Sequence, residues 1–210
     1  MTRKNQNWHS HEGVTLVELL TALVITLVIM GSAVAIFSSA LSTRSRESSK
    51  TDAITSAQAA LSVMSREIGN AGYGLEHNGI GWYSGTTWYT DSTTQFLRFR
   101  ANVNNNDNLT DDPGEDVTYY FDAASESVLR YDRNTGVTSG IINRISNVTF
   151  GYQNYVNSGT PPSGPSDTTG KVTITLTVNL ENVIGQPTNQ SVTLRSDVTL
   201  RNSPYMLSKY

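Results

Sequence analysis

The densest group of oxygen-bearing side chains lies between residues 102 and 116, in a segment dominated by Asn and Asp. Counted from Asn104, its oxygens fall on the first, third, fifth, ninth and twelfth positions of a calcium-binding loop. The candidate ligands are Asn104, Asn106, Asn108, Asp112 and Glu115. The sixth position is Leu109, where such a loop requires Gly, and neutral amides weaken calcium affinity. This segment therefore predicts either a weak calcium site or a solvated Asn/Asp turn.

Other residue types needed for catalysis or metal binding are scarce. The chain has three histidines, His9, His11 and His77, which are too few for a zinc site or a His-based triad. It has no cysteine, so disulfides and thiolate metal sites are excluded. A formal net charge of -3 provides no basic field for phosphate contacts. We expect neither an enzyme nor a protein that binds nucleic acid directly.

Glu18 lies near the start of a long apolar segment. The 25 residues from Leu19 to Thr43 are uncharged, which exceeds the roughly 20 residues needed to cross a bilayer as a helix. Arg3 and Lys4 precede the segment, and this predicts a cytoplasmic N-terminus and an exported remainder. A carboxylate within a membrane span costs on the order of 2–3 kcal/mol, less at the headgroup level. Glu18 therefore either has a function or lies at the headgroups.

The residues around Glu18 form a specific pattern. Residues 13–18, GVTLVE, follow a short basic leader and resemble the processing site of type IV prepilins. The resemblance implies that prepilin peptidase cleaves after Gly13 and that Val14 becomes N-methylated. It also implies that Glu18 neutralises the N-terminal amine of a neighbouring subunit during filament assembly. The leader departs from the family in having Glu12 directly before Gly13.

Two further segments extend the resemblance. Residues 65–73, SREIGNAGY, and residues 198–204, VTLRNSP, are similar to PilW-like minor pilins and to J-type pseudopilins of type II secretion. The resemblance implies that the partners are other pilins or pseudopilins and an inner-membrane assembly platform. It implies a single-pass protein of the bacterial inner membrane that then enters a pilus at the cell surface or a periplasmic pseudopilus. Because minor pilins and pseudopilins share fold and processing, the choice between them stays open.

An ordinary secretory signal is the alternative to a prepilin leader. Ala33-Val34-Ala35 matches a signal-peptidase pattern, although the apolar segment is longer than a signal peptide requires. A signal-anchored periplasmic binding domain would need no cleavage after Gly13 and would tolerate Glu18→Ala.

One long helix is expected to carry these N-terminal features. No Pro or Gly occurs between Arg44 and Ile68, and apolar residues recur there every three or four positions. They are Ile54, Ala57, Leu61, Met64 and Ile68. We expect a leader over residues 1–13 and a helix over residues 14–68, roughly 80 Å long at 1.5 Å per residue. Residues 14–41 would form the transmembrane segment and the filament core.

Residues 69–210 are expected to form one exported, β-rich domain. Residues 172–180 alternate between apolar residues and mostly threonines, which predicts a sheet with one buried face. The expected strands are Gln95–Ala101, Val117–Asp122, Ser127–Asp132, Ile141–Gln153, Val172–Leu180 and Ser191–Arg201. Packing the amphipathic half of the helix on one curved antiparallel sheet gives an α+β, pilin-like fold. Four aromatic residues between positions 82 and 89 are expected in a loop, either capping the core or forming an exposed contact or adhesive patch.

Overall fold

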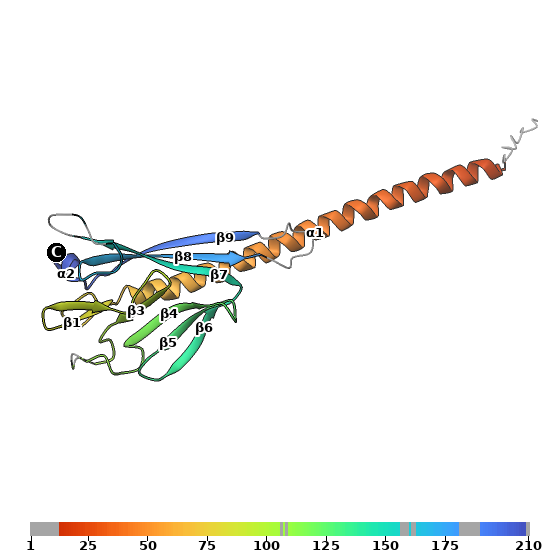
Figure 1. Ribbon diagram of the computed structural model, residues 1–210. Coiled ribbons are helices and arrows are strands. Elements are labelled where there is room, and N and C mark those ends of the chain that lie inside the picture. The colour runs from red at the N-terminus through yellow and green to blue at the C-terminus, as the bar shows by residue number, and fades with distance from the viewer. Residues whose placement is uncertain are drawn as a thin grey trace, which may run out of the picture. The chain divides into compact units, whose positions relative to one another are not determined.

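The computed structural model describes residues 13–105, 107, 109–155, 160, 163–180 and 190–208. The chain divides into two compact units, Met1–Ser45 and Arg46–Tyr210. Helix α1 (Leu16–Ile68) contributes residues to both units. The N-terminal unit consists of the apolar half of α1 and the residues before it. The C-terminal unit holds the remainder of α1 and the β-rich domain (Figure 1).

The described part of the C-terminal unit contains three antiparallel sheets. The first has the order β1-β2, the second β3-β4-β5-β6 and the third β7-β8-β9. The elements after α1 are β1 (Gly81–Ser84), β2 (Thr87–Thr90), β3 (Phe96–Arg100), β4 (Asp116–Asp122), β5 (Ser127–Asp132), β6 (Val137–Ile142), β7 (Ile145–Asn154), β8 (Thr169–Asn179), β9 (Ser191–Thr199) and the short α2 (Pro204–Leu207). This layout confirms the predicted α+β class, a long N-terminal helix with a C-terminal antiparallel domain.

Two local predictions were wrong. The single strand expected over Ile141–Gln153 is two strands, because Arg144 adopts a left-handed conformation, φ 60°, that a strand cannot continue. No Gly or Pro marks that turn. The aromatic segment expected to be a loop forms the β1-β2 hairpin, which turns at Gly85 with φ 64°. The expected single curved sheet is also replaced by separate sheets around one core.

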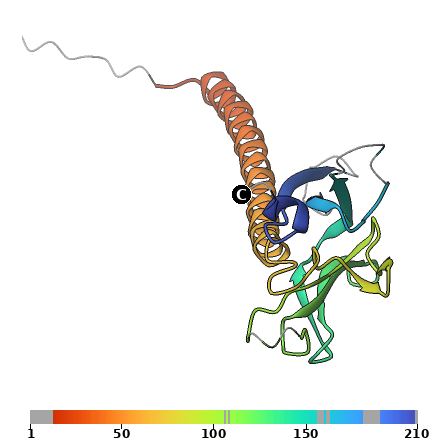
Figure 2. The same ribbon diagram turned by 90° about the vertical axis from the view of Figure 1, so that its left-hand side faces the viewer.

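The C-terminal half of α1 packs against two sheets at once. In both ribbon views the β7-β8-β9 sheet lies on one side and the β3-β6 sheet on another, with this half of the helix along both (Figures 1 and 2). Five helical residues join the core: Ala57, Ala60, Leu61, Met64 and Ile68. Full burial of a side chain such as Met64 or Ile68 contributes about 1.5–3 kcal/mol. Ile54, predicted on the same stripe, is only partly buried.

A polar contact fixes the end of α1 to the four-stranded sheet. The Glu67 carboxylate accepts hydrogen bonds from the Tyr119 hydroxyl at 2.8 Å and from Arg130 Nε at 2.9 Å. Tyr119 and Arg130 face each other across β4 and β5. Burial, followed by the Glu67 charge, raises the pKa of Tyr119 well above its usual value, so its hydroxyl stays a donor. One carboxylate thus joins the helix to two strands.

We expect Glu67→Ala to lower the free energy of unfolding by about 1–3 kcal/mol, because Tyr119 and Arg130 lose a shared acceptor in a partly buried site. Urea unfolding of the detergent-solubilised protein, followed by near-ultraviolet circular dichroism, measures the change. Glu47→Ala removes an exposed carboxylate from the same helix and is the matched control. Equal stability of the two variants would contradict this role for Glu67.

Candidate functional site

The start of α1 is defined by a hydrogen-bonded cap. The Thr15 hydroxyl accepts from the Glu18 backbone N–H at 3.2 Å, and the Thr15 carbonyl accepts from the Leu19 N–H at 3.1 Å. The same hydroxyl lies 3.5 Å from Glu18 Oε2, to which it donates. A Thr followed three residues later by Glu matches the sequence of a capping box, and here the Thr15 hydroxyl satisfies one of the amides that a helix start leaves free. The sequence-based prediction missed this role of Thr15, although the Thr-x-x-Glu spacing before an apolar run signals it.

Gly13 and Val14 precede the cap and lie outside the helix. Both residues are exposed, and an added Cβ at Gly13 would meet no atom within 4 Å. A peptide bond in non-helical, accessible backbone is available to a protease, whereas a bond inside a helix must first unfold. The structure therefore places the predicted scissile bond, Gly13–Val14, just before the first hydrogen-bonded turn. Residues 1–12 of the predicted leader lie outside the described residues.

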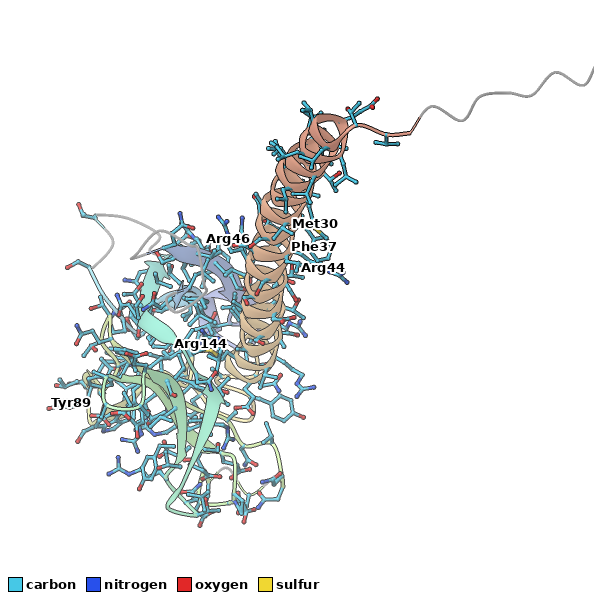
Figure 3. All side chains as sticks on the ribbon, turned by 90° about the vertical axis from the view of Figure 1, so that its right-hand side faces the viewer. Met30, Phe37, Arg44, Arg46, Tyr89 and Arg144 are labelled. Atoms are coloured by element: carbon cyan, nitrogen blue, oxygen red, sulfur yellow. The ribbon has the colours of Figure 1, made fainter. Side chains whose placement is uncertain are left out.

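The apolar half of α1 exposes its side chains on every side. Sixteen large apolar residues between Val14 and Leu41 are each at least half exposed. Figure 3 shows Met30 and Phe37 projecting from the helix surface. Within the described residues, α1 is the one helix long and apolar enough to cross a membrane. This surface is consistent with membrane anchoring, because a helix apolar on all sides belongs in lipid or among other helices.

Three hydroxyl groups of this segment bond to their own helix. Thr21 donates to the Glu18 carbonyl at 2.9 Å, Thr26 to Ala22 at 2.7 Å and Ser32 to Val28 at 2.7 Å. Such bonds to a preceding turn remove the need for water or an external partner. From residue 16 to residue 43, Glu18 is then the one ionisable side chain. It is therefore the one position in this segment where a partner of opposite charge could bind as an ion pair.

The alternative signal-peptidase pattern lies within the same helix. Residues Ala33 to Ala35 are helical and stand well inside the bounds of α1. Cleavage there would require local unfolding of a regular helix, whereas the Gly13–Val14 bond needs none.

The Asn/Asp segment is organised around the fully buried Glu115. Glu115 Oε1 accepts the backbone N–H groups of Val103 and Asn104, each at 2.9 Å, and Oε2 accepts that of Asp112 at 3.2 Å. The Asp112 carboxylate in turn accepts from Asn105 Nδ2 at 2.6 Å. The Glu115 carboxylate therefore holds the loop in shape through three backbone N–H groups. Calcium binding by Glu115 would require it to release backbone amides.

The predicted calcium ligands are only partly described. Asn104, Asp112 and Glu115 are placed, whereas Asn106 and Asn108 lie outside the described residues. In the part of the chain that the structure describes, no group of three or more His, Asp or Glu side chains is arranged to hold a metal ion. A site built mainly from amide oxygens would not form such a group, so weak calcium binding stays a prediction.

The N-terminal geometry defines a class: a protein with an accessible bond before a capped, apolar helix and an acidic residue in its first turn. Comparison with protein families finds a match to the prokaryotic N-terminal methylation motif over residues 8–40. The comparisons with curated proteins and with solved structures found no match. The match indicates a type IV pilin-like protein of the prepilin type.

A calcium site at residues 104–115 would stabilise the folded protein, because an ion that binds only the native state raises its melting temperature. The measurement is the melting temperature in 10 mM calcium chloride and in chelator, with magnesium chloride at equal ionic strength as the control. We expect an increase in calcium only, reduced by Asp112→Asn and not by Asp122→Asn, which changes an aspartate elsewhere. Identical melting temperatures in calcium and in chelator would refute the site.

Proposed function

We propose that this chain is a PilW-like minor pilin of a type IV pilus, a structural subunit that primes or caps filament assembly. Residues 1–13 form the leader, residues 14–41 the membrane span and later the filament core, and residues 69–210 the exported domain. Prepilin peptidase cleaves after Gly13, and Val14 is then N-methylated. The partners are other pilins and the inner-membrane assembly platform. In this role the protein contributes to pilus biogenesis and thereby to adhesion or motility.

The observation that carries this proposal is the position of the methylation motif on the structure. The motif covers residues 8–40, and within it the Gly13–Val14 bond is accessible while the following helix is already capped. Cleavage would therefore release a chain whose helix begins two residues after its new N-terminus. The methylation-motif family is structural rather than catalytic, and we propose no enzymatic activity.

Charge explains why Glu18 follows the scissile bond. Cleavage creates a positive amine at Val14, next to the positive end of the helix dipole. N-methylation keeps that amine basic, so a carboxylate is needed to balance it. Opposite charges attract strongly in a low dielectric, and each alone would be costly there. We propose that Glu18 pairs with the amine of a neighbouring subunit during assembly.

The alternative within the same fold is a J-type pseudopilin, which would assemble in the periplasm and push secreted proteins outward. Its cleavage and methylation would be the same, so those reactions do not separate the two. A signal-anchored binding domain is the second alternative and predicts neither reaction. Assembly into an extracellular pilus distinguishes the minor pilin from both.

Processing gives the first test. In a host with active prepilin peptidase, we expect an intact mass equal to residues 14–210 plus one methyl group, and N-terminal sequencing should begin at methylated Val14. A host without the peptidase should keep the full-length chain. Gly13→Leu should block cleavage, whereas Gly31→Leu, in open space on the same segment, should not. A chain starting at residue 1, or after Ala35, in both hosts would refute the proposal.

Assembly gives the second test. Glu18→Ala should be cleaved normally but should enter sheared filaments at least roughly tenfold less efficiently, because the N-terminal amine then stays unpaired in an apolar environment. Glu47→Ala, at an exposed site on the same helix, is the control. The readout is the ratio of filament to membrane protein on immunoblots. Normal incorporation of Glu18→Ala would contradict the pairing role.

A further inference from the structure

Strand β6 is the last strand of the four-stranded sheet, and its outer edge is open. In the order β3-β4-β5-β6 it pairs with β5 alone. Figure 1 shows it at the margin of the sheet. Its first four residues are exposed, and the Val137 side chain is 58% exposed. The proposed processing and the proposed pairing of Glu18 use no residue of this strand.

The register of the sheet shows which backbone groups of β6 point outward. The Arg133 N–H donates to the Asp116 carbonyl of β4 at 2.9 Å, so the even-numbered residues of β5 are the ones that bond to β6. Their partners on β6 include Ser139. Thr138 and Gly140, on either side of Ser139, therefore direct their N–H and C=O groups away from β5. Among the described residues, no backbone hydrogen bond from another segment reaches these groups.

The open edge lacks the features that normally prevent pairing with other chains. Sheets protect exposed edges with charged side chains, proline or a covering element. The edge strand β9 has two of these protections, because it carries Arg195 and Asp197 and because Ser196 is hydrogen-bonded to Ser65 of α1 at 3.0 Å. In contrast, residues 134–143 contain neither a charged residue nor a proline. An edge of this kind is suited to pairing with another strand.

The side chains of β6 define what a partner strand must carry. Val137 and Ser139 lie on the face of the sheet that is turned toward α1, and Thr138 and Gly140 lie on the opposite face. A Cβ on Gly140 would meet no atom within 4 Å, so that face leaves room for side chains of a partner. The register shifts near the end of β6, which limits regular pairing to residues 137–140. A fitting partner is therefore short and uncharged, with an apolar side chain beside Val137.

An extended polypeptide is the ligand that matches these backbone groups. Thr138 and Gly140 together offer two donors and two acceptors in one line, repeated at about 7 Å, the spacing of alternate residues in a strand. A second strand presents complementary groups at the same repeat and can form four hydrogen bonds at once. Water and small ligands satisfy such groups only one at a time. Addition of a strand to an open edge is a common mode of peptide recognition.

A second copy of this chain is a poor occupant of the edge. Antiparallel pairing of two β6 strands would place Ser139 opposite its counterpart, because Thr138 and Gly140 carry the outward groups. The two domains would then be related by a half-turn about an axis perpendicular to the sheet. The C-terminal half of α1 lies along this sheet, so the two copies of that half would run in opposite directions (Figures 1 and 2). Subunits that leave one membrane for one filament share a direction.

We propose that β6 pairs with an extended, uncharged strand of a different pilin subunit in the same filament. The partner bonds to the N–H and C=O groups of Thr138 and Gly140 and covers Val137 with an apolar side chain. The inference rests on the proposed filament function and adds to it a contact made by the C-terminal domain. Glu18 and β6 would then hold one subunit at two separate places.

Incorporation into filaments gives the first test. Val137→Lys places a charge on the open edge, and Thr138→Pro removes an outward N–H that the sheet itself does not use. Each variant should lower the ratio of filament to membrane protein at least roughly fivefold, because both changes block strand addition. Leu207→Lys, at a residue that is 59% exposed, is the matched control for Val137→Lys and should enter filaments as the parent does. Thermal unfolding should show parent-like melting temperatures for Val137→Lys and Leu207→Lys.

Amide hydrogen exchange gives the second test, because it reads main-chain pairing directly. The Thr138 and Gly140 amides should exchange rapidly in the detergent-solubilised full-length protein and at least roughly tenfold more slowly in sheared filaments. The Ser139 amide, which is bonded to β5, should exchange slowly in both states. Equal exchange of Thr138 and Gly140 in the two states would overturn the proposal.

The remaining outcomes separate the possible errors. The chain has no cysteine, so Ser139→Cys introduces a single thiol that would join two copies in the self-paired arrangement. A disulfide-linked homodimer of this variant in membranes would show that a second copy occupies the edge, and the proposed partner would be wrong. Absence of the parent protein from filaments would refute the filament function itself. Normal entry of both Val137→Lys and Thr138→Pro beside the parent would refute the pairing of β6 alone.

Discussion

The exposed apolar surface between Val14 and Leu41 sets the conditions for the rest of the molecule. At about 1.5–3 kcal/mol for each large side chain, keeping sixteen of them in water would cost tens of kcal/mol. That exceeds the roughly 5–15 kcal/mol by which a domain is stable. The segment therefore needs an apolar environment, either lipid or other helices.

The C-terminal domain obtains its stability from its own core. Its core is closed by the second half of α1, which presents a buried stripe to two sheets and a carboxylate, Glu67, to a tyrosine and an arginine. Apolar packing alone would allow α1 to shift along its axis relative to the two sheets. The two directional hydrogen bonds to Glu67 oppose such a shift. Apolar burial thus supplies most of the stabilisation, and the polar contact fixes the register.

Much of this was predictable, and the errors have physical causes. The spacing of apolar residues located α1 and strands β3, β4, β5, β8 and β9 to within a few residues. A helix or strand with one buried face carries apolar residues at regular intervals, and these intervals can be read from the sequence. The turn at Arg144 was missed because a non-Gly residue adopts the left-handed conformation there. The β1-β2 hairpin was missed because its Gly, Ser and Thr content resembles a loop. The cap of Thr15 on Glu18 was missed although their three-residue spacing signals it, whereas the role of Glu115 depends on backbone amides that only the folded loop brings together.

The serine and threonine side chains of the apolar segment have one further consequence. Since Thr21, Thr26 and Ser32 donate to carbonyls of their own helix, they form no bond that depends on the identity or angle of a neighbour. Rotation of the helix about its axis therefore breaks no hydrogen bond of these three side chains. If the chain enters a filament as proposed, it can pass from lipid to neighbouring helices without breaking any of these three hydrogen bonds.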